Sequence, residues 1–144
     1  MNSLLPALSL SAYTGYWASV VFLGLAGILT IVPGLIHSFL PDGGAESIAR
    51  LKLGKQRDVV IGTFRWAGAT QIVWGLAMLA VAFRYPMLTP LFLLLILVER
   101  SLLVTRWWLL KPPGKSHHPP EHYASAVLLP VVALFLALSL LGRA

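Results

Sequence analysis

The stretch LFLLLILVERSLLVTRWWLLKPP, residues 91–113, decides the fold, because it places an acidic and a basic residue inside an otherwise lipid-soluble run. A bilayer core about 30 Å thick is crossed by roughly 20 apolar residues in a helix. The stretch has that length and ends in two prolines, so it predicts a membrane-spanning helix. Glu99 and Arg100 then lie within the membrane, where a charged side chain normally faces the bundle interior and pairs.

The composition of the whole chain agrees with a membrane protein. Of its 144 residues, 58% are hydrophobic and 11% are charged, which leaves too few charges to cover a soluble domain. The formal net charge of +6 gathers beside apolar runs, so it indicates membrane topology and not a nucleic-acid partner. There is no cysteine, which excludes disulfides, thiolate metal sites and cysteine nucleophiles.

Four apolar segments are long enough to cross the bilayer: residues 16–40, 59–82, 87–110 and 123–141. Clusters of proline and glycine follow the first and third segments, and Tyr85-Pro86 separates the second from the third. We therefore predict an all-α fold, an integral membrane antiparallel four-transmembrane-helix bundle formed by a single membrane domain of residues 1–144. Short connections are expected to place successive helices side by side, in a compact bundle.

The basic residues predict the orientation of this bundle. Six of the eleven lysines and arginines lie in the connections at 41–58 and 111–122, namely Arg50, Lys52, Lys55, Arg57, Lys111 and Lys115. The opposite side holds only Arg84 and Arg143, so the positive-inside rule puts both basic connections in the cytoplasm and both termini outside. No Lys or Arg precedes Arg50, so the chain start lacks the basic region of a signal peptide and is expected to lead into the first span.

Small residues predict close packing between helices, because they let membrane helices approach each other. In the second segment, small or short polar side chains recur every four residues and form one ridge: Thr63, Ala67, Gln71 and Gly75. The first segment contributes Gly24, Gly27 and Gly34.

A polar cluster is predicted near the middle of the bundle. Glu99 and Arg106 are seven residues apart and share one helix face, whereas Arg100 points about 100° away. Counted from the cytoplasmic helix ends, Glu99 lies roughly 18 Å deep and Gln71 roughly 20 Å deep. Arg65, about 10 Å deep on the second helix, is expected to reach the Glu99 carboxylate with two hydrogen bonds.

Histidines and tryptophans complete the predicted site. All four histidines lie toward the cytoplasmic side, and Trp66 and Trp74 offer a wall for a flat apolar ligand unless they face lipid or pack between helices. The predicted ligand-binding residues are His37, Arg65, Trp66, Gln71, Glu99, Arg106 and His118. Since cations outnumber anions around Glu99, an anionic or electron-rich ligand is expected in place of a metal ion.

The segment HHPPEH, residues 117–122, carries three side chains of metal-ligand type, which are those of His118, Glu121 and His122. It differs from the HExxH motif, and its prolines interrupt the helix that would align the ligands, so no metal site is predicted. His37 has no second histidine within a span, which excludes a bis-histidine haem. Glycine-rich phosphate loops, nucleophile elbows and nucleic-acid modules are absent from the sequence, so the cofactor stays open and no nucleic-acid partner is expected.

With the four segments in view, residues 16–142 resemble the DoxX-like superfamily of small four-helix bacterial membrane proteins, most closely its uncharacterised branches. The similar features are an Arg-x-x-Gly start of the second helix at Arg65 and Gly68, a Gly-x-x-x-Leu run at Gly75 and Leu79, and an arginine-containing end of the third helix at 99–106. The resemblance implies a four-helix bundle in the bacterial inner (plasma) membrane. Some members of the family look like membrane subunits of oxidoreductases that deliver electrons to quinone.

Two functions are favoured by these features, and transport is a third, less favoured because no inverted repeat is detectable and alternating access would require a dimer. The first is a membrane subunit or a binding protein that holds a lipid or quinone in a cytoplasm-facing polar pocket, with partner membrane subunits or a second copy of the chain. The second is a small membrane enzyme, an isomerase, hydratase or quinone-linked reductase, in which Glu99 or His122 acts as acid/base and Arg65 stabilises developing negative charge. The polar cluster is also compatible with a structural ion-pair network that fixes helix register.

Overall fold

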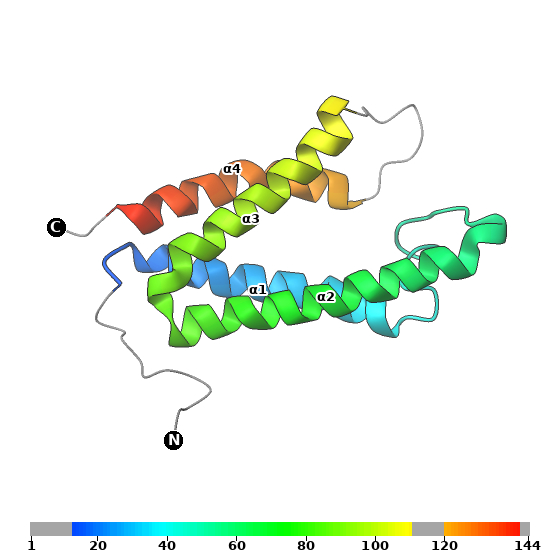
Figure 1. The fold of residues 1–144 in the computed structure, drawn as a ribbon, viewed down its shortest axis with the longest axis horizontal. Helices are drawn as coiled ribbons and strands as arrows, with labels where there is room; N and C mark the ends of the chain where they lie inside the picture. Colours follow the sequence, from blue (N-terminus) through cyan, green and yellow to red (C-terminus); the bar gives the residue numbers. More distant parts are fainter. Residues whose placement is uncertain (1–12, 111–119, 142–144) are drawn as a thin grey trace, which may run out of the picture.

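A computed structural model describes residues 13–110 and 120–141, and every regular element in these ranges is helical. Four long helices form the chain (Figure 1): α1 (Trp17–Phe39), α2 (Arg57–Arg84), α3 (Thr89–Val104) and α4 (Pro120–Leu140). Three shorter elements accompany them: the 3₁₀ helices η2 (Gly54–Gln56) and η3 (Pro86–Leu88), and the π-helix η4 (Thr105–Leu110), which extends α3. Four helical segments are long and apolar enough to cross a membrane, so the predicted all-α four-helix fold is confirmed.

The helix boundaries follow the turn residues of the sequence. α2 ends where the Tyr85 amide donates to the Val81 carbonyl at 2.9 Å, and Pro86 opens the next turn. Pro90 sits in the first turn of α3, where a missing amide hydrogen costs little because that position has no helical acceptor. The connection between α2 and α3 is therefore as short as the sequence predicts.

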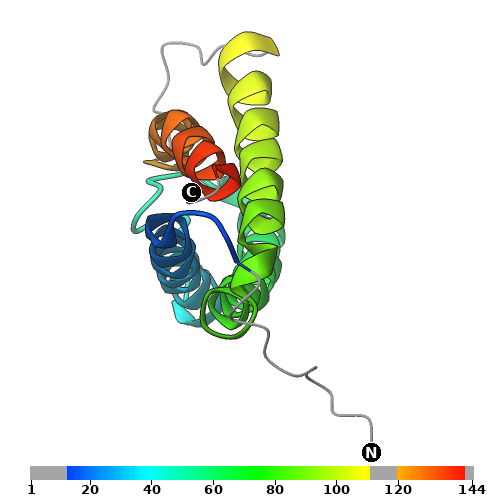
Figure 2. The ribbon, with the colours of Figure 1, turned by 90° about the vertical axis from the view of Figure 1, so that its left-hand side faces the viewer.

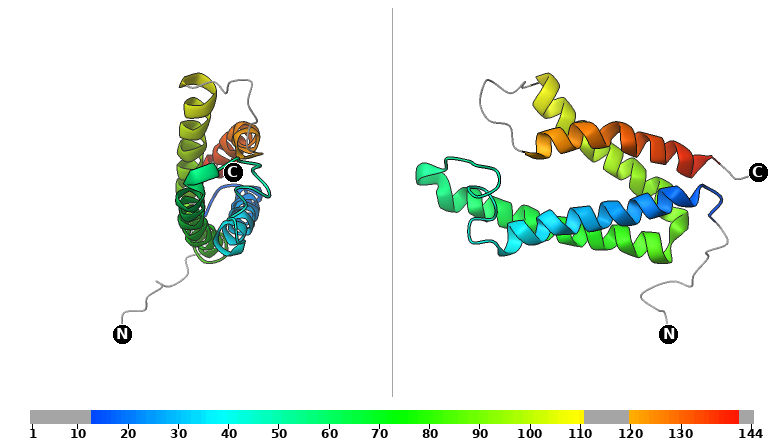
Figure 3. Two further views of the ribbon diagram at one scale, coloured as in Figure 1. Left: turned by 90° about the vertical axis from the view of Figure 1, so that its right-hand side faces the viewer. Right: turned by 180° about the vertical axis from the view of Figure 1, so that it is seen from behind.

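The four helices pack as two antiparallel pairs. α1 lies along α2, and α3 lies against α4, whereas α2 and α3 make few contacts and diverge from the turn that joins them (Figures 1 and 3). Figure 2 shows α3 rising from the level of α2 to that of α4 and beyond. The expectation that all successive helices lie side by side is wrong for α2 and α3, because a short turn joins the helix ends but leaves the angle between them free.

Glycines bring α1 and α2 into backbone contact. A Cβ atom added at Gly68 would lie 2.7 Å from the carbonyl oxygen of Gly34, and one added at Gly75 would lie 2.7 Å from that of Gly27. Such distances leave no room for a side chain at either crossing point. The predicted close packing is confirmed for Gly27, Gly34 and Gly75. The predicted ridge on the second helix included Ala67, but the residue that contacts Gly34 is its neighbour Gly68.

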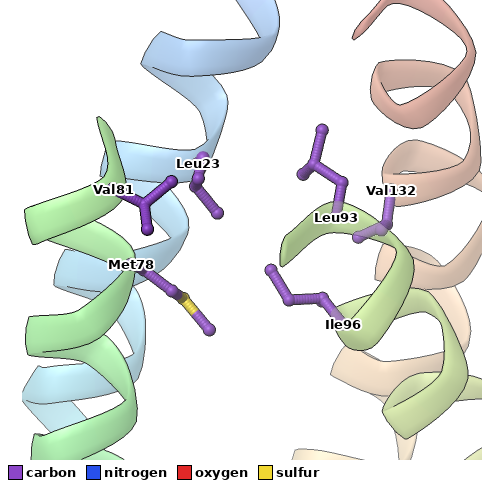
Figure 4. Close-up of a cluster of buried hydrophobic side chains, with 6 residues drawn as sticks. All are labelled: Leu23, Met78, Val81, Leu93, Ile96 and Val132. Carbon is purple, nitrogen blue, oxygen red and sulfur yellow. The ribbon is translucent and has the colours of Figure 1, made fainter. Parts of the chain in front are cut away.

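The buried core lies at the end of the bundle where α1 begins and α4 ends. It is built from six apolar side chains of all four helices: Leu23, Met78, Val81, Leu93, Ile96 and Val132. Figure 4 shows the three from α1 and α2 facing the three from α3 and α4.

Hydrogen bonds join α1 to α4 at this same end. The Tyr16 amide donates to the Leu138 carbonyl at 3.2 Å, and Ser19 Oγ donates to the Phe135 carbonyl at 2.8 Å. We call this the closed end of the bundle. The open end is the opposite one, which carries residues 40–56 and the start of α4.

Candidate functional site

A cleft of about 900 Å³ lies between the two helix pairs, toward the open end. α2 forms most of its wall with Trp66, Ala67, Ala69, Thr70, Gln71, Val73, Trp74 and Ala77, and α1 adds Thr30, Pro33 and His37. α3 and α4 supply Glu99, Arg100, Leu103 and Glu121. The cleft exists because α2 and α3 diverge, so the side chains on their facing sides do not interdigitate. Its volume is within the range of small-molecule sites, roughly 300–1,000 Å³.

Arg100 is the centre of the polar side of the cleft. Its Nη1 atom donates hydrogen bonds to the Glu121 carboxylate and, at 3.1 Å, to Ser125 Oγ. Its Nη2 atom lies 3.6 Å from Glu99 Oε2. Ser125 Oγ in turn donates to Glu121 Oε1 at 3.2 Å, so one guanidinium ties α3 to the first turn of α4.

The three charged side chains of this network differ in exposure. The Arg100 side chain is 15% exposed, whereas those of Glu99 and Glu121 are 45% and 56% exposed. The guanidinium is therefore enclosed by its partners, and both carboxylates remain accessible. Glu121 also lies in the first turn of α4, where the helix dipole favours a negative charge.

The predicted pairing of Glu99 with Arg65 and Arg106 is wrong. Glu99 pairs with its neighbour Arg100, and within the described ranges neither of the other two arginines forms an ion pair with it or lines the cleft. Arg65 donates instead to the Pro41 carbonyl at 3.3 Å. Equal depth in the membrane does not bring α2 and α3 side chains together, because these helices diverge. Arg106 lies in the π-helix η4, whose wider turn changes the angular spacing on which the shared face depends.

His37 lines the cleft from the last turn of α1. Its Nδ1 atom lies 2.6 Å from the Gly43 carbonyl oxygen, which can only accept a hydrogen bond. Nδ1 therefore carries the hydrogen, and in the neutral ring Nε2 is an acceptor. Phe64 packs edge-on against the ring with centroids 5.1 Å apart, which helps fix its orientation.

Two polar atoms at the cleft are buried and have no hydrogen-bond partner among the described residues: Gln71 Oε1 and Arg100 Nε. A buried polar atom without a partner costs about 1–3 kcal/mol. A ligand that supplied the missing partners would recover part of that free energy. The sequence predicts that Gln71 and Glu99 lie at a similar depth in the membrane, and both residues line the cleft.

Trp66 and Trp74 form the aromatic part of the wall. Trp66 is 73% exposed, and Trp74 stacks on Phe92 of α3 with centroids 5.4 Å apart and planes 17° from parallel. This stack is one of the few contacts between α2 and α3.

The remaining predicted site residues lie elsewhere. The ring of His122 stacks on Trp107 at 4.4 Å, its carbonyl accepts a hydrogen bond from Trp108 Nε1 at 3.3 Å, and it does not line the cleft. His118 lies outside the described residues. Within the described ranges, no group of three or more His, Asp or Glu residues is placed to hold a metal ion.

The segment after α1 folds back over the open end. The Asp42 carboxylate accepts hydrogen bonds from the amides of Ser47, Gly44 and Glu46 at 2.7, 3.0 and 3.1 Å. These bonds hold the pKa of the Asp42 carboxyl well below its usual range, and the bond from the Ser47 amide has the largest effect. A second cavity of about 360 Å³ lies beneath this segment and shares five lining residues with the cleft: Pro33, His37, Ala67, Gln71 and Glu121.

The role of Arg100 and the participation of Ser125 were missed from the sequence. The available signal is the pair of Glu121 and Ser125, four residues apart and therefore on one face of the fourth helix. Together they offer a guanidinium two acceptors, and Arg100 is a membrane-embedded cation in need of them.

No protein-family model, curated protein or solved structure matches the chain. The resemblance to the DoxX-like superfamily therefore stays a prediction.

Proposed function

We propose that this chain is a multi-pass membrane protein that binds a small amphipathic molecule of the lipid or quinone class in the cleft. The ligand's apolar part lies against α2, and its polar part lies near Arg100. The observation that carries the proposal is the cleft itself, whose wall includes two tryptophans and whose buried Gln71 Oε1 and Arg100 Nε have no partner among the described residues.

Entry from the lipid phase is supported by the exposure of the wall. Trp66 and Val73 are 73% and 67% exposed on the side of α2 that faces the cleft. Because α2 and α3 separate there, a molecule dissolved in the bilayer reaches the cleft without crossing the loops. The apolar surface of such a ligand has already left water, so its affinity for the cleft comes from close packing against the wall and from hydrogen bonds to the polar groups of the cleft.

The proposal includes an orientation and a location. The open end carries four basic residues between α1 and α2, at Arg50, Lys52, Lys55 and Arg57, and the positive-inside rule assigns this end to the cytoplasm. The membrane proposed is the bacterial inner membrane, as the family resemblance implies. The polar part of a bound ligand would then lie in the cytoplasmic half of the bilayer.

A catalytic alternative is supported by one observation, which is that His37 and Glu99 line the same cleft. An imidazole with an accepting Nε2 and a carboxylate are groups that transfer protons in isomerases, hydratases and reductases. In this alternative His37 takes the role that the sequence gave to His122. Turnover of a cleft ligand that is lost in His37→Gln while binding survives would support it.

The binding proposal is tested with a variant whose new side chain fills the cleft without changing the charge of the cleft. Thr70→Trp places a large side chain on the cleft wall, and Val59→Trp places the same side chain at a 68% exposed position of α2 outside the cleft. Both proteins are purified in mild detergent, and the co-purifying lipids and quinones are quantified by mass spectrometry. We expect Thr70→Trp to lose a stoichiometric component that Val59→Trp keeps. Equal recovery from both variants would contradict the proposal.

A further inference from the structure

We infer that the ligand's polar part is positively charged, so that the cleft takes an amphipathic organic cation, an ammonium or related group carried on an apolar ring or chain. This inference rests on the proposed binding function and names the chemistry of the ligand. It reverses the expectation from sequence of an anionic or electron-rich ligand. Charge, hydrogen bonding and aromatic surface each support it.

The charge balance of the cleft is negative. Among the described residues, the charged side chains that line it are Glu99, Glu121 and Arg100, which are two carboxylates against one guanidinium. The sequence-based expectation counted Arg65 and Arg106 as well, but neither lines the cleft. A net negative charge within a membrane is costly, and a bound cation offsets that cost.

The terminal nitrogens of the Arg100 guanidinium already face acceptors of the protein. Nη1 contacts Glu121 and Ser125, and Nη2 lies beside Glu99, while the buried Nε has no partner among the described residues and stays open to an acceptor atom of the ligand. An anion that bound the terminal nitrogens would have to displace a carboxylate from them. Each carboxylate, in contrast, uses one oxygen in these contacts, namely Glu121 Oε1 and Glu99 Oε2, and retains a second oxygen for a ligand.

The hydroxyl and imidazole groups of the wall also present acceptors. Thr30 Oγ1 and Thr70 Oγ1 donate their hydrogens to the carbonyls one turn earlier, at 2.8 and 3.2 Å, so only their lone pairs remain. His37 donates through Nδ1 to Gly43 and leaves Nε2 as an acceptor in the neutral ring. With Gln71 Oε1, these groups favour a ligand that donates hydrogen bonds or carries positive charge.

The aromatic wall favours the same charge. The face of an indole ring attracts a cation that lies within about 6 Å of its centroid, and tryptophan is the strongest of the aromatic side chains in this respect. Trp66 and Trp74 both line the cleft, on the helix opposite Glu99 and Arg100. An ammonium group between the helices would have carboxylates on one side and the indole side chains of Trp66 and Trp74 on the other.

The test uses two ions of the same shape and opposite charge, tetraphenylphosphonium and tetraphenylborate. Their binding to the purified full chain in lipid nanodiscs is measured by titration calorimetry, with empty nanodiscs as the partition control. We expect the cation to bind at least about tenfold more tightly than the anion. Glu99→Gln is expected to weaken cation binding by about tenfold. The matched control Glu46→Gln, which removes a carboxylate paired with Arg57 outside the cleft, should leave it unchanged.

A second variant tests the same inference without changing the ion-pair network. Trp66→Leu removes an aromatic face without touching Arg100 or its partners, and we expect it to weaken cation binding several-fold while the protein stays folded. Tighter binding of the anion, or cation binding that both Glu99→Gln and Trp66→Leu leave unchanged, would overturn the inference.

The failure of the inference is distinguishable from the failure of the proposed function. If Thr70→Trp removes a co-purifying lipid while the anion binds better than the cation, the cleft is a binding site and only the charge assignment is wrong. If Thr70→Trp changes neither lipid recovery nor the binding of either ion, both statements are refuted.

Discussion

The contacts that join the two helices within a pair differ between the α1–α2 pair and the α3–α4 pair. α1 and α2 meet where Gly27 faces Gly75 and Gly34 faces Gly68, so that backbone touches backbone and no charge is involved. α3 and α4 meet toward the open end through Arg100 and two acceptors on α4. The first pair depends on steric fit, whereas the second pair is joined at this end by a charged network that also lines the cleft.

The largest effect is expected from breaking the glycine contact. Gly68→Val places a Cβ 2.7 Å from the Gly34 carbonyl oxygen and should lower the free energy of unfolding by about 3 kcal/mol. Gly62→Ala is the control, because a Cβ at Gly62 meets nothing within 4 Å, and its effect should stay below about 1 kcal/mol. Unfolding in detergent is followed by circular dichroism. Two variants of equal stability would show that the α1–α2 contact is not governed by steric fit.

An intermediate effect is expected from the charged network, measured by a double-mutant cycle. Arg100→Met removes a mostly buried guanidinium and leaves two carboxylates unpaired, so we expect a loss of about 2 kcal/mol. Glu121→Gln should cost less, about 1 kcal/mol, because the Glu121 side chain is 56% exposed and screened by solvent. The coupling between the two changes should be about 1 kcal/mol.

The control cycle uses the pair of Arg57 and Glu46, whose side chains are 48% and 40% exposed at the open end. Its coupling should be no more than about 0.5 kcal/mol. Equal coupling in the two cycles would mean that the network between α3 and α4 behaves as an ordinary surface ion pair.

The four spans could be predicted from sequence because length and apolar composition decide them. Each predicted segment overlaps an observed helical element, and the turn at Tyr85-Pro86 ends α2 as expected. Hydropathy gives the depth of a residue in the membrane, but tilt and rotation depend on packing against neighbours. For this reason the level of Gln71 and Glu99 could be estimated, while the partner of Glu99 could not.

The smallest effect is expected at Asp42, in the segment that links α1 to α2. Its lowered pKa means that the charged carboxylate stabilises the fold at every pH above the ordinary carboxyl pKa of about 4. That stabilisation is lost only as the pH falls through the lower folded-state pKa. The amides of Gly44 and Ser47 should therefore stay protected from hydrogen exchange even below about pH 4 in the unaltered protein.

Asp42→Ala should remove this protection at all pH values without unfolding the helices. Asp58→Ala, a change of an exposed carboxylate in the first turn of α2, serves as the control and should leave both amides protected. Exchange is read by mass spectrometry after correction for the intrinsic rate at each pH. Identical protection in both variants would show that the carboxylate does not organise this segment.

The joining of the helix pairs at one end has a mechanical consequence. The hydrogen bonds of Tyr16 and Ser19, together with the stack of Phe22 on Phe135 at 4.2 Å, join α1 to α4 at the closed end of the bundle. A rigid helix of about 20 residues is roughly 30 Å long, so a rotation of about 5° at one end displaces the other by roughly 2.6 Å. A rotation of one helix pair about these contacts would therefore be largest at the open end. The width of the cleft would then depend on side chains at the closed end that do not line it.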